Sequence, residues 1–222
     1  EEDKRKVNCS ESRNTRNVSV KAGDSIMNRK ALFAGLLLVL FASVSVSAAE
    51  KFVLDAAHST VEFGVRHLVI SKTKGTFNDV SGVLMYDKDK VTNSSVEITI
   101  KTASIDTENE KRDGHLMSAD FFDAEKYPEI TFVSKKIVEK DGKYTAIGDF
   151  TIKDVTKEIE LPFEITGVVK GMGGNTLIGV EAELTIDRRD YGLTWSKVME
   201  TGALVVGNDV EIEISVEFGS EM

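Results

Sequence analysis

Three histidines, His58, His67 and His115, are the side chains of this sequence best suited to bind a metal ion or to transfer protons. They lie far apart along the chain, and no spacing typical of a metal motif connects them. On a single strand, His58 and His67 would have opposite parity and would point to different faces of a sheet. We therefore predict no metal site, and we expect the histidines to make packing or hydrogen-bonding contacts.

No serine or cysteine of this sequence lies in a motif that would activate it as a nucleophile. Serines are abundant, but none lies in a G-x-S-x-G elbow. The sole cysteine, Cys9, precedes the segment that we expect to be exported. Carboxylates are too common to mark a site, because an acidic chain carries most of them on its solvated surface. The sequence thus predicts no catalytic residue and no cofactor. One alternative stays open, an enzyme acting on a small apolar substrate, with or without a histidine-bound metal.

The segment Arg112–Leu116, RDGHL, combines a cation, an anion and an imidazole next to two phenylalanines. In one interpretation the segment is structural, and Arg112 and Asp113 fix a helix onto the sheet through charge-assisted hydrogen bonds. In the other, Arg112 or His115 contacts the polar headgroup of a ligand at the entrance of a cavity. Both depend on the elements that carry these residues.

Those elements are expected to be β-strands, because polar and apolar residues alternate from about Ala49 to Met222. In Ser95–Lys101, for example, every second residue is apolar. Turn-forming segments such as Gly171–Asn175 separate about eight or nine strands, which predicts an antiparallel sandwich or barrel. Strand parity nominates these residues as inward-facing and ligand-binding: Val61, Phe63, Val65, Ile98, Ile100, Phe132, Phe150, Ile152, Phe163, Val180, Ala182 and Leu184.

One insertion, Asp106–Tyr127, does not alternate and is rich in helix formers. We predict one or two short helices there, with Ser118 as a cap and Pro128 as the end, covering an end or side of the sheet. Large aromatic residues at a barrel end pack over its interior or line it. Candidates for the rim are Phe121, Phe122 and the single tryptophan, Trp195, and candidates for polar headgroup contacts are Arg66, His67, Arg112 and His115.

The charge of the chain restricts its partners. A net charge of −9 repels phosphate backbones, so no nucleic acid is expected as a partner. A transmembrane barrel would turn its apolar rows toward lipid, but the alternate rows carry charges such as Glu181, Glu183, Glu211 and Glu213. These charges must face water, so the apolar rows face inward and no stable membrane insertion is expected. Eight strands enclose room either to be filled by side chains or to hold one small ligand, and the residues alone leave both outcomes open.

The beginning of the chain has the pattern of a secretory signal peptide. Two cations precede an apolar run from Ala31 to Ala42, and small residues follow as far as Ala48 or Ala49. The apolar run is shorter than the ~20 residues that a bilayer span needs. The predicted organisation is an unstructured upstream segment over residues 1–26, a signal peptide over 27–48 and a single exported domain over 49–222.

Four blocks of the sequence resemble the YceI-like polyisoprenoid-binding proteins of the bacterial periplasm. The blocks are Phe52–Gly82, Ser104–Phe132, Gly148–Ile159 and Asp187–Phe218, which follow the family order and span nearly all of the exported part. The resemblance implies an all-β fold, a lipocalin-like antiparallel eight-stranded β-barrel with one or two short helices inserted between strands. It also implies an apolar interior that holds the tail of a polyisoprenoid, an isoprenoid quinone or a similar amphiphilic lipid without a covalent bond.

From this resemblance we expect a periplasmic carrier rather than an enzyme. Motif residues of the family pattern are matched by His58, Phe63, Arg66, His67, Arg112, Asp113, His115 and Leu116. The sequence does not identify the lipid, does not separate transport from storage or sensing, and leaves a homodimer open.

Overall fold

Strands make up most of the described part of the chain, as the alternating pattern predicts. The computed structural model describes residues 49–199 and 204–221, which belong to a compact unit spanning Ser45–Met222. Its strands are β1 (Glu50–Leu54), β2 (Thr60–His67), β3 (Ser71–Phe77), β4 (Val80–Tyr86), β5 (Ser95–Lys101), β6 (Ile105–Asp106), β7 (Glu129–Lys140), β8 (Lys143–Ile152), β9 (Val155–Lys170), β10 (Thr176–Asp187) and β11 (Val206–Ser220). Its helices are α1 (Glu110–Met117) and the short 3-10 helices η1 (Ala56–His58), η2 (Val91–Asn93), η3 (Thr102–Ser104) and η4 (Arg188–Tyr191).

The N-terminal part of the predicted organisation is not tested by the structure. The upstream segment over residues 1–26 and the signal peptide over residues 27–48 lie outside the described residues and stay predictions. Among the residues that are described, no helix has both the length and the apolar character that a membrane span requires.

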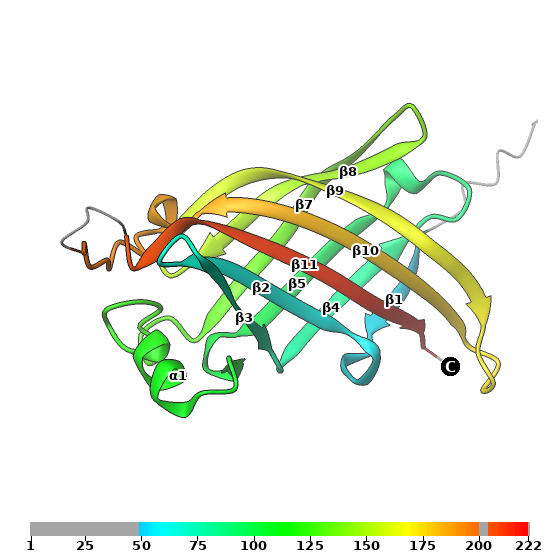
Figure 1. The fold of residues 1–222 in the computed structure, drawn as a ribbon. Coiled ribbons are helices and arrows are strands. Elements are labelled where there is room, and N and C mark those ends of the chain that lie inside the picture. Colours follow the sequence, from blue (N-terminus) through cyan, green and yellow to red (C-terminus); the bar gives the residue numbers. More distant parts are fainter. Residues whose placement is uncertain (1–48, 200–203, 222) are drawn as a thin grey trace, which may run out of the picture. The chain divides into compact units, whose positions relative to one another are not determined.

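The strands form one antiparallel sheet that closes on itself (Figure 1). The closed ring has the order β1-β4-β5-β7-β8-β9-β10-β11, and β11 pairs back with β1. The remaining strands, β2, β3 and β6, continue the ring strands β1, β4 and β5. β1 and β2 both pair with β11, β3 pairs with β2, and β6 pairs with β3. The predicted eight-stranded antiparallel β-barrel is therefore confirmed, with three of its eight strands broken into two pieces.

The breaks lie where backbone groups form hydrogen bonds outside the regular pairing of the strands. Between β3 and β4, for example, the strand is interrupted at Asn78 and Asp79. There the Asn78 amide donates to the Ser104 carbonyl, and the Asp79 carbonyl accepts from the Lys101 amide. These two backbone groups at the break are thus satisfied by the end of β5 and by η3, as buried backbone groups require.

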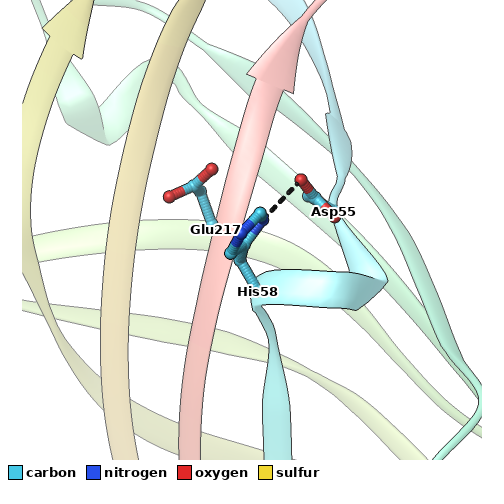
Figure 2. Close-up of side chains that lie close together, drawn as sticks. All are labelled: Asp55, His58 and Glu217. Carbon is cyan, nitrogen blue, oxygen red and sulfur yellow. Dashed lines mark hydrogen bonds and ion pairs between the residues drawn. The ribbon is translucent and has the colours of Figure 1, made fainter. Parts of the chain in front are cut away.

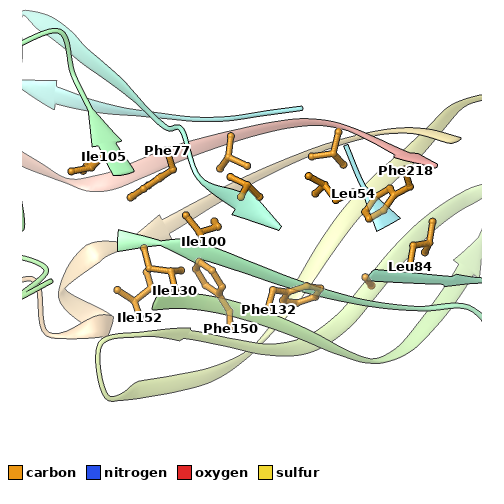
Figure 3. Packing of buried hydrophobic residues seen from close by; sticks show 14 of the residues in the cluster. Leu54, Phe77, Leu84, Ile100, Ile105, Ile130, Phe132, Phe150, Ile152 and Phe218 are labelled. Carbon is orange, nitrogen blue, oxygen red and sulfur yellow. The ribbon is translucent and has the colours of Figure 1, made fainter. Parts of the chain in front are cut away.

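The register places the apolar rows inside the barrel. Ala182 of β10 lies opposite Ile214 of β11, which lies opposite Val61 of β2. The next residues along these strands, Glu183 and Glu213, pair on the outer face. Figure 3 shows such apolar side chains projecting from the strands into the interior. Burial of each large apolar side chain contributes about 1.5–3 kcal/mol, so this interior stabilises the closed sheet.

The insertion between β6 and β7 contains one α-helix, α1, in agreement with the prediction of one or two. The side chain of Asn109 accepts a hydrogen bond from the Arg112 amide and caps the first turn. Ser118 lies at the other end of the helix, where its hydroxyl donates to the His115 carbonyl at 2.7 Å. The helix lies beside one end of the barrel, near β3 (Figure 1).

Candidate functional site

The interior of the barrel contains a cavity of about 210 Å³. This volume is more than ten times the ~10–15 Å³ that one water molecule needs, so it is not a packing defect. Its wall is built from inward-facing side chains of the barrel strands, with a few residues from α1 and the connecting segments, and is almost entirely apolar. Every residue that strand parity nominated lines it: Val61, Phe63, Val65, Ile98, Ile100, Phe132, Phe150, Ile152, Phe163, Val180, Ala182 and Leu184.

Burial changes along the cavity wall formed by β10, β11 and β2. At the end nearest β1, Phe52, Ile178 and Phe218 are buried with at most 2% of their surface exposed. Toward the other end, Ile186 and Val210 also line the cavity but are only partly buried. Along β10 and β11 the cavity wall is therefore closed at the β1 end and more open at the end where β10 stops and β11 starts, although Arg188, Leu193 and Phe121 are buried beside that more open end.

Three aromatic rings pack together beside this more open end. His115 of α1 lies 5.0 Å from Phe121 and 5.0 Å from Trp195, and Phe121 lies 5.1 Å from Trp195, measured between ring centres. Phe121 and Phe122 belong to the cavity wall, whereas His115 and Trp195 do not. The structure thus brings the aromatic rim candidates into one region, with Trp195 and His115 forming an outer layer over Phe121.

The remaining polar candidates lie outside the cavity wall. Arg112 donates from Nε to the Thr107 hydroxyl at 2.7 Å and from a terminal nitrogen to the Thr107 carbonyl at 2.6 Å. Asp113 accepts hydrogen bonds from the amide and the hydroxyl of Thr107. This geometry matches the structural interpretation of RDGHL, because both charged side chains fix α1 to the residue after β6. Arg66 and His67 lie at the end of β2, and neither side chain has a hydrogen-bond partner among the described residues.

Comparison with known proteins decides the family of this barrel. Residues 52–218 match the YceI-like domain. This chain belongs to the YceI-like family. The UPF0312 protein SAS2572 of Staphylococcus aureus (strain MSSA476) is 39% identical over 169 residues, which cover 76% of this chain and 96% of that protein.

Solved structures share the same fold. A YCEI protein from Campylobacter jejuni is 37% identical, with a TM-score of 0.61 over 71% of this chain and 90% of that chain. A polyisoprenoid binding domain from Saccharophagus degradans is 16% identical, with a TM-score of 0.60 over 78% of this chain and 99% of that chain. The second likeness concerns the fold alone.

In this YceI-like barrel, sequence reasoning missed one buried cation of the cavity wall, Arg188. It is 3% exposed and donates hydrogen bonds to the backbone carbonyls of Gly207, Leu193, Trp195 and Val206. Burial lowers the pKa of its guanidinium, but the group stays charged because its ordinary pKa is far above neutral pH. Arg188 thereby connects the segments before and after the loop between β10 and β11. In the sequence it adjoins Arg189, and no local signal distinguishes the buried arginine from the exposed one.

The three histidines of the chain do not converge. Within residues 49–199 and 204–221, the groups that could supply three metal ligands reduce to Asp55, His58 and Glu217, whose ligand atoms lie within 4.8 Å of one another (Figure 2). This group contains one histidine and lies near the break between β1 and β2. Asp55 accepts hydrogen bonds from the Ala57 amide at 2.9 Å and pairs with His58 Nδ1 at 2.9 Å, so it shapes the turn that joins the two strands.

The pair Asp55–His58 is expected to show coupled titration. Asp55 raises the pKa of His58 above 6.5, mainly through their hydrogen bond, and His58 lowers the pKa of Asp55 below 3.8. The His58 contribution to stability is present below its unfolded pKa and is lost as pH rises through the raised value. The Asp55 contribution is present above its unfolded pKa and is lost as pH falls through the lowered value.

Replacing Asp55 by Asn should therefore lower the pKa of His58, as measured by NMR titration of its ring protons. Glu217→Gln is the matched control and should lower that pKa less, because Glu217 acts on His58 only through its charge. An unchanged His58 pKa in the Asp55→Asn protein would contradict this account of the turn.

Proposed function

We propose that this YceI-like protein binds a long-chain isoprenoid-type lipid noncovalently inside its barrel and carries it in the periplasm. The observation that supports this most directly is the apolar cavity of the lumen, whose wall is formed by residues such as Ile98, Phe163, Leu184 and Ile214. A space lined by hydrocarbon does not bind water well, so an apolar guest is favoured over solvent.

The apolar wall can provide affinity without any chemistry. Each methylene group that moves from water into the lumen contributes about 0.8 kcal/mol. A few isoprene units therefore supply several kcal/mol before the cost of ordering the lipid. Such a site selects mainly by length and branching of the tail, since pockets of this kind discriminate weakly between hydrocarbons of similar bulk.

The polar groups of the lumen indicate how the lipid is oriented. Arg188 is occupied by backbone carbonyls and is not free to bind a headgroup. The polar end of the lipid, a quinone ring or an isoprenoid headgroup, is then expected at the more open end, where Arg66 and His67 are accessible. The fold that this chain shares with a polyisoprenoid binding domain supports the same class of ligand.

Native mass spectrometry of the protein purified from its own periplasm tests the proposal. We expect a mass above that of the exported chain, and organic extraction should release an isoprenoid-type lipid. Protein that is ligand-free when purified and that also fails to take up a polyprenol in solution would contradict the proposal. Recovery of the protein in the cytoplasmic fraction would contradict the location.

A further inference from the structure

An exposed apolar surface lies at the more open end of the barrel. It consists of Val69 and Ile70, in the turn between β2 and β3, and of Val198 and Met199, in the loop between β10 and β11; we call these four residues the apolar tip. Their exposed fractions are 68%, 83%, 67% and 42%. Figure 1 shows the turn and the loop at the same end of the barrel. Large apolar side chains that remain exposed in a group mark a contact surface.

Hydrogen bonds connect the two segments that form the apolar tip. The Leu68 amide donates to the Val205 carbonyl at 3.1 Å, and the Val205 amide donates to the Lys197 carbonyl at 2.9 Å. Val198 forms an isolated bridge with Leu204. These backbone contacts hold the turn and the loop together, so the four side chains form one surface.

The turn adopts a backbone conformation that its residues disfavour. Leu68 has a φ of 50° and Val69 a φ of 66°, in the left-handed region. A β-branched residue rarely adopts this conformation, and such strain is concentrated at functional sites. The hairpin between β2 and β3 favours this conformation, but asparagine or glycine would adopt it without strain. An exposed valine at this position does not help the fold in water, and it would be useful in a contact made outside the protein.

The charges around the apolar tip differ from those of the rest of the chain. The net charge is −9, yet residues 63–78 and 191–199 contain no carboxylate. Lys72 and Lys74 in these segments pair with glutamates of neighbouring strands. Arg66 forms no ion pair within 4 Å among the described residues, but its charge helps to lower the pKa of Glu211 after that of Lys72. Lys197 has no ion-pair partner in the described part and lies 5.9 Å from the Trp195 ring. Glu200, the next residue, lies outside the described part. Cations beside an apolar surface complement lipid phosphates.

The apolar tip adjoins the cavity. His67, which precedes the turn, pairs with Val206, and Val206 and Val65 both belong to the cavity wall. The hairpin between β9 and β10 also exposes apolar side chains, Val169 at 58% and Met172 at 110%. That hairpin lies at the end where Phe52, Ile178 and Phe218 close the lumen.

We propose that the apolar tip inserts into the surface of a phospholipid bilayer and brings the more open end of the cavity to the lipid. The inference rests on the proposed function, because a cargo dissolved in a bilayer has to enter the barrel from it. A second copy of the chain fits the surface less well. Four side chains fall short of the roughly 800 Å² that each partner of a stable interface buries, and Arg66 and Lys197 would face like charges.

Vesicle flotation of the chain 49–222 tests this inference. In the Staphylococcus aureus relative the matched region is 96% of the protein, so the barrel is a complete chain there. The shorter chain omits the apolar run Ala31–Ala42, which would itself bind vesicles. Vesicles of phosphatidylcholine and phosphatidylglycerol should bind the wild-type chain. The double variant Val69→Ser/Ile70→Ser should bind on the order of tenfold more weakly. The matched control at the closed end, Val169→Ser/Met172→Ser, should bind like wild type.

A second measurement separates this inference from the proposed function. Both double variants should bind a fluorescent polyprenol analogue in solution as the wild type does, and both should keep its circular dichroism spectrum. Wild-type protein that takes up the analogue but does not float, or an equal loss in both variants, would overturn the membrane contact. A dimer that is lost only in the tip variant, without vesicle binding, would assign the surface to a second copy. Vesicle binding without uptake of the analogue would support the contact and overturn the proposed function.

Discussion

Filling the lumen is expected to abolish lipid binding while the barrel stays folded. Val180 and Leu184 of β10 line the cavity and are only partly buried, so the double variant Val180→Phe/Leu184→Phe places two rings in empty space. If the rings displace three or four methylene groups of the lipid, the affinity falls about 100-fold. Fluorescence titration with a polyprenol analogue measures this loss.

The outer face of the same strand provides the control. Thr185 is exposed and adjoins Leu184, so Thr185→Phe adds a ring without entering the lumen. We expect unchanged affinity for Thr185→Phe. For the filled variant we expect a change in the free energy of unfolding within about 1–2 kcal/mol, because the cavity accepts the added volume. Undiminished binding by the filled variant would place the lipid outside the barrel.

Loss of the Arg188 guanidinium is expected to destabilise the barrel strongly. In Arg188→Met the carbonyls of Gly207, Leu193, Trp195 and Val206 lose their donor while they stay largely covered. Unsatisfied buried groups cost about 1–3 kcal/mol each, with partial relief by water, so we expect a loss of roughly 3–5 kcal/mol. Urea denaturation followed by circular dichroism measures this change.

Arg189 is the matched control for Arg188. It is exposed and pairs with Asp187 at 2.5 Å, an interaction that solvent screens. Arg189→Met should therefore shift the urea midpoint much less than Arg188→Met does. Equal midpoints for the two variants would mean that the carbonyls around Arg188 find other donors, and that the residue is not needed to connect the two sides of the β10–β11 loop.

Strand parity predicted the cavity wall, because a side chain on a closed sheet points either in or out. Phe63 and Ile98 could be assigned to the interior from their neighbours alone. The breaks were not predictable in this way. The interruption at Asn78 depends on the Ser104 carbonyl, which is remote in sequence.

The polar candidates were harder to assign because charge alone does not fix where a long side chain points. Arg112 was placed at a cavity entrance in one interpretation, but its guanidinium binds Thr107. Arg188 carries no periodic signal that reveals its burial. Whether the lumen is open or filled also depends on the summed volumes of facing side chains across the barrel, which no single segment contains.

The closing seam of the barrel joins the beginning and the end of the described chain. β11 is the last strand, and it pairs with both β1 and β2. Until it arrives, β2 and β10 each lack a partner along one edge. Pairing between segments so distant in sequence slows folding, since the loop entropy is lost before the contacts form. The sheet can therefore close only after the C-terminal strand has been synthesised, and its edges are open to association with other chains until then.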